Sequence, residues 1–279
     1  MRIAILADIH GNLPALEAAL DEVARLQVDQ LVILGDIVVG APDSLACWER
    51  VKGLGCAVLR GNHERYVFDL DTERARPEWS TPQFGPVRFA ANQLGDTNRQ
   101  ELARLPATLR MADCEDMLLV HASARNDNDL IFPYTADAAV EQMFAGVTEP
   151  WLVRGHNHFA SVRLWGDRRI VTVGAVGLPL DGMPAAQFTV MEKWKGEWRV
   201  DHRCARYDVG ETVRRFYDSG YLDTAGPMAR LYLREVLTAS FHMIPFLKFY
   251  GELRNRDPGV SLEDAIARFW PTGLGPIPK

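Results

Sequence analysis

Residues 2–20 read RIAILADIHGNLPALEAAL, and this stretch decides the fold class. The continuous apolar run from Ile3 to Ala7 is typical of a buried strand. The next apolar positions recur at the spacing of a helix, and they are Leu13, Leu16, Ala19, Leu20, Val23 and Leu26. The stretch therefore predicts a strand, a short polar loop and a helix.

The same pattern repeats immediately downstream. Residues 31–34 form a second apolar run, 42–52 have a helical pattern, and 56–59 form a third short apolar segment. Alternating strands and helices imply parallel strands with helices packed on the faces of the sheet. We therefore expect an α/β fold.

The remainder of the chain divides into three parts. Residues 64–110 are polar with a helical pattern and predict a helical insertion or cap near the site. Apolar segments at 117–120, 151–153, 162–165, 170–173 and 188–191 then predict strands. Because tight turns such as Gly166-Asp167 join several of these strands, we expect the second half to be a largely antiparallel sheet. We therefore assign residues 1–205 to one main domain.

Beyond residue 206 the pattern becomes helical again, which predicts a C-terminal helical extension over 206–279. The apolar stretch 236–250 contains His242, Pro245 and Lys248, so it predicts a helix pair broken at Pro245 rather than a membrane span. Its dense apolar cluster is suited either to core packing or to association between copies, which makes a homo-oligomer possible. The cluster consists of Phe241, Ile244, Phe246, Leu247, Phe249 and Tyr250.

Charge and cysteine content exclude several classes of protein. The formal net charge of −6 provides no broad cationic surface, so stable nucleic-acid binding is not expected. The four cysteines show no CxxC spacing and indicate neither a thiolate zinc site nor a disulfide framework. The N-terminal apolar run is too short for a signal peptide, so we expect a cytoplasmic protein.

Side chains that can bind metals follow the ends of the predicted strands. Five of the seven histidines fall at these positions. In open α/β sheets the loops at the carboxyl ends of strands converge to form sites. The residues concerned are Asp8, His10, Asp36, Asn62, His63, His121, His156 and His158.

The chemistry of this set favours two ions. Carboxylate, imidazole and amide-oxygen ligands suit divalent Mn, Fe, Zn, Co or Ni without selecting among them. Two carboxylates and four imidazoles exceed the four protein ligands of one tetrahedral site. A pair of metals about 3.5 to 4 Å apart is a known arrangement for phosphoester hydrolysis.

Five ordered segments resemble the signature blocks of calcineurin-like metallophosphoesterases, in particular the small bacterial phosphodiesterase-like members. The blocks are Asp8-Ile9-His10, Gly35-Asp36, Gly61-Asn62-His63-Glu64, Val120-His121 and Gly155-His156-Asn157-His158. The resemblance implies an αββα sandwich of two facing mixed β-sheets flanked by helices.

The resemblance also implies a role for each site residue. Asp8, His10 and His158 would hold one metal, and Asn62, His121 and His156 would hold the other. Asp36 would bridge the two metals, with manganese favoured among the candidate ions. A hydroxide held by both metals would then attack phosphorus in line. His63 would bind no metal, but would stabilise developing charge or protonate the leaving oxygen.

The expected activity is hydrolysis of a nucleotide-like or other small phosphodiester. Protein phosphatases of this family carry Asp-Arg-Gly after the Gly-Asp pair, whereas Ile37-Val38-Val39 follow Asp36 here. Arg65 and Arg125, each just beyond a ligand block, are candidates for binding the substrate phosphate. A solvated surface position is the alternative for each arginine. The helical stretch 66–104 is hypothesised to roof the site.

Two other functions remain open at this stage. The same centre would serve a phosphomonoesterase or a dinucleoside-polyphosphate hydrolase. A different class is a non-catalytic metal-binding scaffold, although a degenerate copy is expected to lack at least one of the ligand positions. The pattern does not specify the physiological substrate, the identity of the metal, the oligomeric state or the role of the C-terminal helices.

Overall fold

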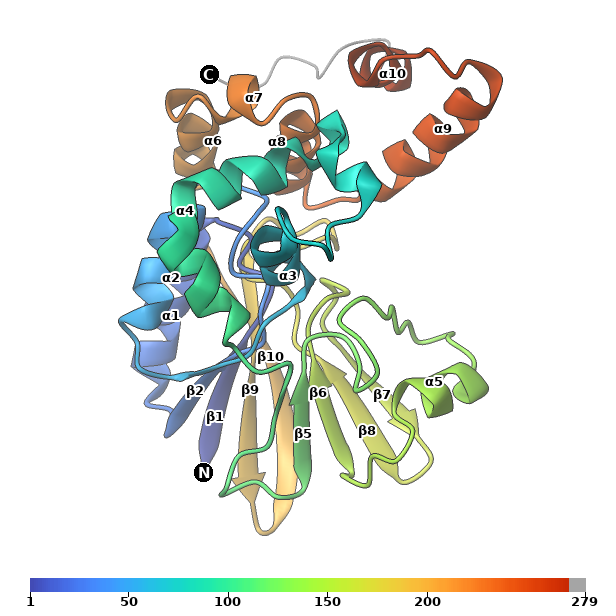
Figure 1. The fold of residues 1–279 in the computed structure, drawn as a ribbon. Coiled ribbons are helices and arrows are strands. Elements are labelled where there is room, and N and C mark those ends of the chain that lie inside the picture. The colour runs from blue at the N-terminus through green and yellow to red at the C-terminus, as the bar shows by residue number, and fades with distance from the viewer. Residues whose placement is uncertain (271–279) are drawn as a thin grey trace.

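The computed structural model describes residues 1–270, which form two five-stranded sheets flanked by helices (Figure 1). The first sheet has the order β10 (Glu197–Ala205), β9 (Ala186–Trp194), β1 (Arg2–Leu6), β2 (Gln30–Ile33) and β3 (Ala57–Val58). The second has the order β4 (Thr108–Leu109), β5 (Met117–Val120), β6 (Trp151–Arg154), β8 (Arg168–Thr172) and β7 (Ser161–Trp165).

Helices cover the outer faces of the two sheets and their carboxyl-end edge. The α-helices are α1 (Leu13–Leu26), α2 (Ser44–Lys52), α3 (Asn62–Asp69), α4 (Gly85–Ala103), α5 (Asp137–Met143), α6 (Val209–Asp218), α7 (Tyr221–Thr224), α8 (Met228–Thr238), α9 (Met243–Arg256) and α10 (Leu262–Phe269). Two 3₁₀ turns, η1 (Pro77–Ser80) and η2 (Pro82–Phe84), lie between α3 and α4. None of the helices in residues 1–270 has the length and apolar character needed to cross a membrane.

Successive side chains of β1 point alternately into two different cores, one on each face of the first sheet. In β1, Ile3 and Ile5 belong to a core shared with residues of β5 and β6, so they lie between the two sheets. Ala4 and Leu6 belong to a second core, which includes the apolar faces of α1 and α2. Because successive side chains point to opposite faces, a strand buried on both faces needs a continuous apolar run. The predicted αββα sandwich is confirmed.

Strand pairing confirms part of the expected topology and corrects another part. β1 pairs in parallel with β2, and β2 with β3, as the alternating pattern predicted. The predicted hairpin at Gly166-Asp167 joins β7 and β8. The prediction of a largely antiparallel second half was wrong, because β5, β6 and β8 are mutually parallel and β9 joins the first sheet beside β1. Periodicity identifies strands, whereas partners far apart in sequence determine their direction.

The C-terminal helices lie over the same edge of the sheets as α4 (Figure 1). The Thr212 hydroxyl donates to Asn12 Oδ1 (2.9 Å), and the Tyr221 hydroxyl donates to the Gly40 carbonyl (2.7 Å). Both acceptors lie in loops that follow strands of the first sheet. These helices are therefore hydrogen-bonded to the loops at that edge. Residues 271–279 of the predicted extension lie outside the described residues.

The predicted helix break at Pro245 was placed too late. The chain leaves helical geometry between α8 and α9, at 239–242, and Pro245 lies in the first turn of α9. Proline is tolerated there because the first N–H groups of a helix have no intrahelical acceptor.

Candidate metal centre

All the metal-capable side chains predicted from the sequence lie at the carboxyl ends of the strands. Loops after β1, β2, β5 and β6 supply six of them, and the first turn of α3 supplies Asn62 and His63. Asp8 and Asp36 are buried to 0% and 1% exposure. Buried carboxylates are rare unless they are paired with a cation or bound to a metal.

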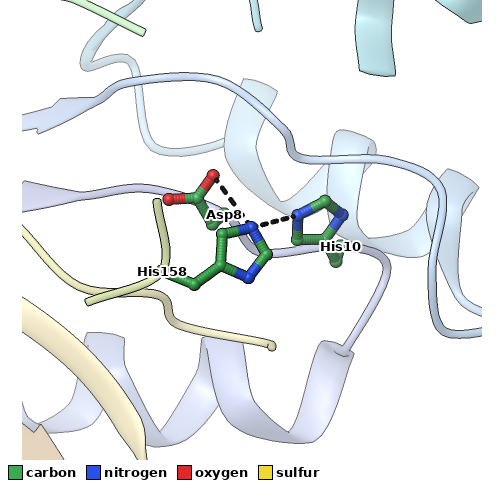
Figure 2. Close-up of side chains that lie close together, drawn as sticks. All are labelled: Asp8, His10 and His158. Atoms are coloured by element: carbon green, nitrogen blue, oxygen red, sulfur yellow. Dashed lines mark hydrogen bonds and ion pairs between the residues drawn. The ribbon is translucent and has the colours of Figure 1, made fainter. Parts of the chain in front are cut away.

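The ligand atoms converge into three overlapping groups that share His10 and Asp36, so they do not represent three separate sites. The groups are Asp8, His10 and His158; His10, Asp36 and His63; and Asp36, His121 and His156. Within each group the candidate atoms lie within 4.8 Å of one another. Figure 2 shows the first group, in which His158 Nε2 lies 3.1 Å from His10 Nε2 and 3.6 Å from an Asp8 oxygen.

Asp36 lies between the outer two groups. Its Oδ2 is 3.7 Å from His10 Nε2 and 3.2 Å from His121 Nε2. Asn62 Oδ1 lies 3.1 Å from the same nitrogen of His121. One carboxylate oxygen therefore faces imidazoles of both groups.

Backbone carbonyls orient three of the imidazoles. Nδ1 of His10 donates to Val39 O (2.8 Å), and Nδ1 of His121 donates to Leu34 O (2.7 Å). Nδ1 of His158 donates to Leu178 O (2.6 Å). A carbonyl can only accept, so the proton of each neutral ring is on Nδ1 and the Nε2 lone pair faces the centre. This is the arrangement expected of metal-binding histidines.

The electrostatics favour neutral His156 and His158, but a protonated His121 beside ionised Asp36. Burial opposes the charge of His121, yet the carboxylates of Asp36 and Asp8 raise its pKa to about 9. Burial lowers the pKa of His158 to about 4 and holds the pKa of His156 well below its usual value. Burial also opposes ionisation of Asp36, but the adjacent His121 holds the pKa of that carboxyl well below its usual range. Burial raises the pKa of Asp8 to about 8, because the ionised carboxylate loses its hydration. A bound cation would favour ionised Asp8.

Backbone strain is concentrated in the same loops. Five of the nine non-glycine residues with positive φ in residues 1–270 are candidate ligands. They are Asp8, His10, Asp36, His156 and His158, with φ between 50° and 68°. Such conformations are unfavourable for residues with a Cβ and are typical of functional sites.

Two glycines allow the ligand carboxylates to lie close to the backbone. A Cβ on Gly61 would come within 2.2 Å of Asp36 Oδ1, and one on Gly155 within 2.8 Å of Asp8 Oδ2. Either side chain would displace a candidate ligand. The requirement for glycine at these positions therefore comes from close approach.

Glu64 positions the Asp36 loop, a role not anticipated from the sequence. One carboxylate oxygen accepts from the N–H groups of Asp36 (2.8 Å) and Gly61 (2.7 Å). The other accepts from Ile37 (2.7 Å) and Val38 (3.3 Å). The signal available in the sequence was a glutamate at the third position of α3, where such side chains bond back to the helix start.

Arg154, at the end of β6, is a second positioning residue that was missed. It is fully buried, and its guanidinium donates to the carbonyl oxygens of Ala122 (2.5 Å) and Asp129 (2.8 Å) and to Asn157 Oδ1 (2.8 Å). These bonds join the loop after β5 to the loop that carries His156 and His158. A charged residue in an apolar strand directly before Gly155 was the available signal.

The two candidate phosphate-binding arginines are paired with carboxylates. Arg65 forms a two-pronged pair with Asp127 (2.6 and 2.9 Å), and Arg125 forms one with Asp129 (3.0 and 2.7 Å). Arg125 lines a cavity of about 270 Å³ beside His121. His63 lies nearer the candidate ligands, with Nε2 4.0 Å from Asp36 Oδ2, and its Nδ1 is buried without a hydrogen-bond partner.

An open pocket of about 300 Å³ gives access to the candidate ligands. Its floor includes His10, Asp36, Asn62, His63, His156 and His158. Tyr66 is the residue of segment 66–104 that lines it. Most of the remaining lining, which we call the wall, comes from two loops and the C-terminal helices. The arrangement suits a ligand with one anionic group against the floor and an uncharged remainder against the wall.

Comparison with known proteins is consistent with this arrangement. Residues 1–193 match a family described as the calcineurin-like phosphoesterase superfamily domain. A metallophosphoesterase from Sphaerobacter thermophilus superposes with a TM-score of 0.68 at 25% identity, over 86% of this chain and 99% of that chain. A hypothetical protein from Pyrococcus horikoshii has a similar fold, with a TM-score of 0.70 at 21% identity over 86% of this chain and 99% of that chain.

A relative found by sequence is named for its substrate class. The symmetrical bis(5′-nucleosyl)-tetraphosphatase of Vibrio parahaemolyticus is 28% identical over 170 residues, which are 58% of this chain and 59% of that protein.

Proposed function

The chain belongs to the calcineurin-like phosphoesterase superfamily, and from this premise we propose that it is a dinuclear, metal-dependent phosphodiesterase acting on a small, nucleotide-like phosphodiester. Two divalent ions, with manganese favoured, are the proposed cofactors. A substrate with one phosphodiester group is the proposed ligand.

The observation that carries the proposal is the position of Asp36 between two ligand groups. Asp8, His10 and His158 would hold one ion, and Asn62, His121 and His156 would hold the other. A carboxylate oxygen within 3.7 Å of an imidazole from each group is suited to bridge two ions. The donor set fits divalent transition metals, since it combines carboxylate and amide oxygens with imidazole nitrogens. When bound, the ions would supply Lewis-acid charge at the phosphoryl oxygens and lower the pKa of water toward neutrality.

The protein's own residues would orient the substrate and move one proton. His63 lines the pocket beside Asp36, within reach of an ester oxygen on a phosphate at the floor. Burial lowers the pKa of His63, so its imidazole is mainly neutral at neutral pH. We assign it the task of donating a hydrogen bond to the leaving oxygen or, in its protonated form, a proton. Arg65 and Arg125 do not line this pocket, and Arg125 lines the neighbouring cavity beside His121, so both are retained only as secondary phosphate contacts. The guanidinium of either arginine would have to hydrogen-bond the substrate and its carboxylate partner at the same time, so we expect each arginine to contribute modestly to substrate affinity.

The test is hydrolysis of bis(p-nitrophenyl) phosphate by chelator-stripped protein, with and without manganese. Asp36→Asn is the diagnostic variant, and Asp21→Asn, at an exposed position in α1, is the matched control. We expect manganese-dependent hydrolysis in the native protein and the control, and a loss of about 10³-fold or more in the variant. Bound metal is counted by elemental analysis of the same samples.

The outcomes separate the alternatives. Faster hydrolysis of p-nitrophenyl phosphate than of the diester would favour a phosphomonoesterase. Faster hydrolysis of diadenosine tetraphosphate would favour the activity named for the Vibrio relative. Protein that binds two metals per chain and hydrolyses none of these substrates would favour a non-catalytic scaffold.

A further inference from the structure

The C-terminal helices contribute directly to the pocket above the candidate metal ligands. Tyr232 and Glu235 of α8, Phe241 of the connecting loop, and Met243 and Ile244 of α9 all line it. All five positions lie beyond residue 193, where the family match ends. This part of the pocket lining therefore lies outside the segment that matches the family.

Several contacts hold this wall in place against the ligand loops. One oxygen of Glu235 accepts from the backbone N–H groups of His242 and Met243, both at 2.8 Å. The ring of Phe241 contacts that of Phe159, the neighbour of His158 in sequence, with centroids 5.3 Å apart. The Ala239 carbonyl accepts from Gly182 N (2.7 Å). The turn between α8 and α9 is therefore fixed relative to the floor of the pocket.

The wall is mostly apolar and contains one additional carboxylate. Leu130, Phe132, Leu178 and Leu180 from two other loops complete the apolar surface. No lysine or arginine of residues 1–270 lines the pocket, and beyond the candidate ligands its only carboxylate is that of Glu235. The phenol of Tyr232 remains protonated, since burial and the charges of Glu235 and Asp36 raise its pKa. The wall thus offers a donor hydroxyl, an acceptor carboxylate and apolar area.

We propose that α8, α9 and their connecting turn form the subsite for the organic group of the phosphoester substrate. This subsite accepts an uncharged group with an apolar face and hydrogen-bonding edges, and it rejects a second anionic group. The inference rests on the proposed phosphodiesterase function. Tyr232 and Glu235 supply the polar contacts, and Phe241, Met243 and Ile244 supply the apolar contacts.

Charge explains the expected selectivity. The ions proposed at the floor would neutralise one phosphate, whereas a second phosphate would face Glu235 with no lysine or arginine on the wall to compensate. Like charges a few ångströms apart in a partly desolvated pocket repel strongly. We expect a penalty of about tenfold or more in kcat/KM for each additional phosphate on the organic group. Dinucleoside polyphosphates would accordingly be poor substrates.

The experiment compares two matched probes at pH 8, where Glu235, with a pKa of about 7, is mainly ionised. The probes are the p-nitrophenyl ester of thymidine 5′-phosphate and the same ester carrying an additional 3′-phosphate. Manganese-loaded native protein should favour the first at least about tenfold in kcat/KM. Ile244→Arg, at a side chain that is 53% exposed, should reduce that preference severalfold without loss of folding. Leu164→Arg, on β7 and 71% exposed, is the matched control and should leave the preference unchanged.

Two further variants test the polar contacts. Glu235→Gln should reduce the preference in the same direction as Ile244→Arg. Tyr232→Phe should raise KM for the first probe more than it lowers kcat. Circular dichroism and thermal unfolding check that each variant is folded.

A binding measurement supplies a readout that does not depend on turnover. Calorimetric titration of manganese-loaded protein with thymidine 5′-monophosphate and thymidine 3′,5′-bisphosphate should show the same preference for the monophosphate. If both esters are hydrolysed equally and Ile244→Arg changes nothing, the subsite is refuted while the phosphodiesterase function stands. If the monophosphate is preferred in binding but neither ester is hydrolysed, the subsite stands and the proposed activity fails.

Discussion

Glu64 offers a direct test of how the candidate metal centre is held. Its two carboxylate oxygens accept four backbone N–H groups from the segments around Asp36 and Gly61. Glu64→Gln replaces one oxygen with an NH₂ group, which cannot accept. In either orientation of the amide, two of the four N–H groups lose their acceptor.

The expected loss of stability follows from the number of hydrogen bonds lost. A hydrogen bond to a charged group contributes about 1.5 to 3 kcal/mol, so losing two implies a decrease of about 3 to 6 kcal/mol in the free energy of unfolding. This is a large fraction of a typical total of about 5 to 15 kcal/mol. Because the Asp36 loop loses support, the affinity for manganese should also fall, by about 10- to 100-fold.

The measurement is urea unfolding of chelator-treated protein, so that differences in metal affinity do not contribute. It is made at pH 8, because burial raises the pKa of Glu64 to about 7 and the argument requires the ionised carboxylate. Glu49→Gln, at an exposed position in α2, is the matched control and should change stability by less than about 0.5 kcal/mol. A loss below about 1 kcal/mol for Glu64→Gln would refute the view that this side chain supports the loop.

Three further predictions concern the centre and the C-terminal wall. Gly155→Ala should lower the free energy of unfolding by about 1 to 3 kcal/mol and weaken metal retention. The reason is that the added Cβ would lie 2.7 Å from the Cβ of Ala7 and 2.8 Å from Asp8 Oδ2. Urea unfolding measures the stability, and elemental analysis measures the bound metal. Manganese added at 100 times its Kd should stabilise chelator-stripped native protein by about 2.7 kcal/mol per independent ion. Most of this stabilisation should disappear in Asp36→Asn. Thermal unfolding across a manganese titration measures the stabilisation. Burial raises the pKa of Glu235 to about 7, so the folded state binds that proton more tightly than the unfolded chain does. The native protein therefore loses stability as the pH rises from about 4.5 to above 7. Relative to native protein, Glu235→Gln should gain up to about 3 kcal/mol of stability between pH 5 and pH 8, and an unchanged difference would contradict the shift.

The sequence pattern was sufficient for the first strands and helices and for the identity of the clustered side chains, whereas the layers of the fold were predicted through the resemblance to a known family. Period-2 and period-3.6 patterns depend on near neighbours, so Ile3–Ala7 and the apolar positions that follow predicted a strand and a helix correctly. Polar residues directly after buried strands come together because parallel strands end at one edge of a sheet.

Tertiary structure alone decided the strand directions in the second sheet, the support of the ligand loops and the composition of the pocket wall. The parallel pairing of β5, β6 and β8 arises from contacts between distant segments, which local periodicity does not encode. Likewise, Glu64 bonds the Asp36 loop across 26 to 28 positions of sequence. Tyr232 and Glu235 reach the pocket only because α8 folds back over the strand ends, more than 70 residues after His158. Local pattern reports the residues that can bind a ligand, whereas long-range packing determines which of them meet and what surface faces them.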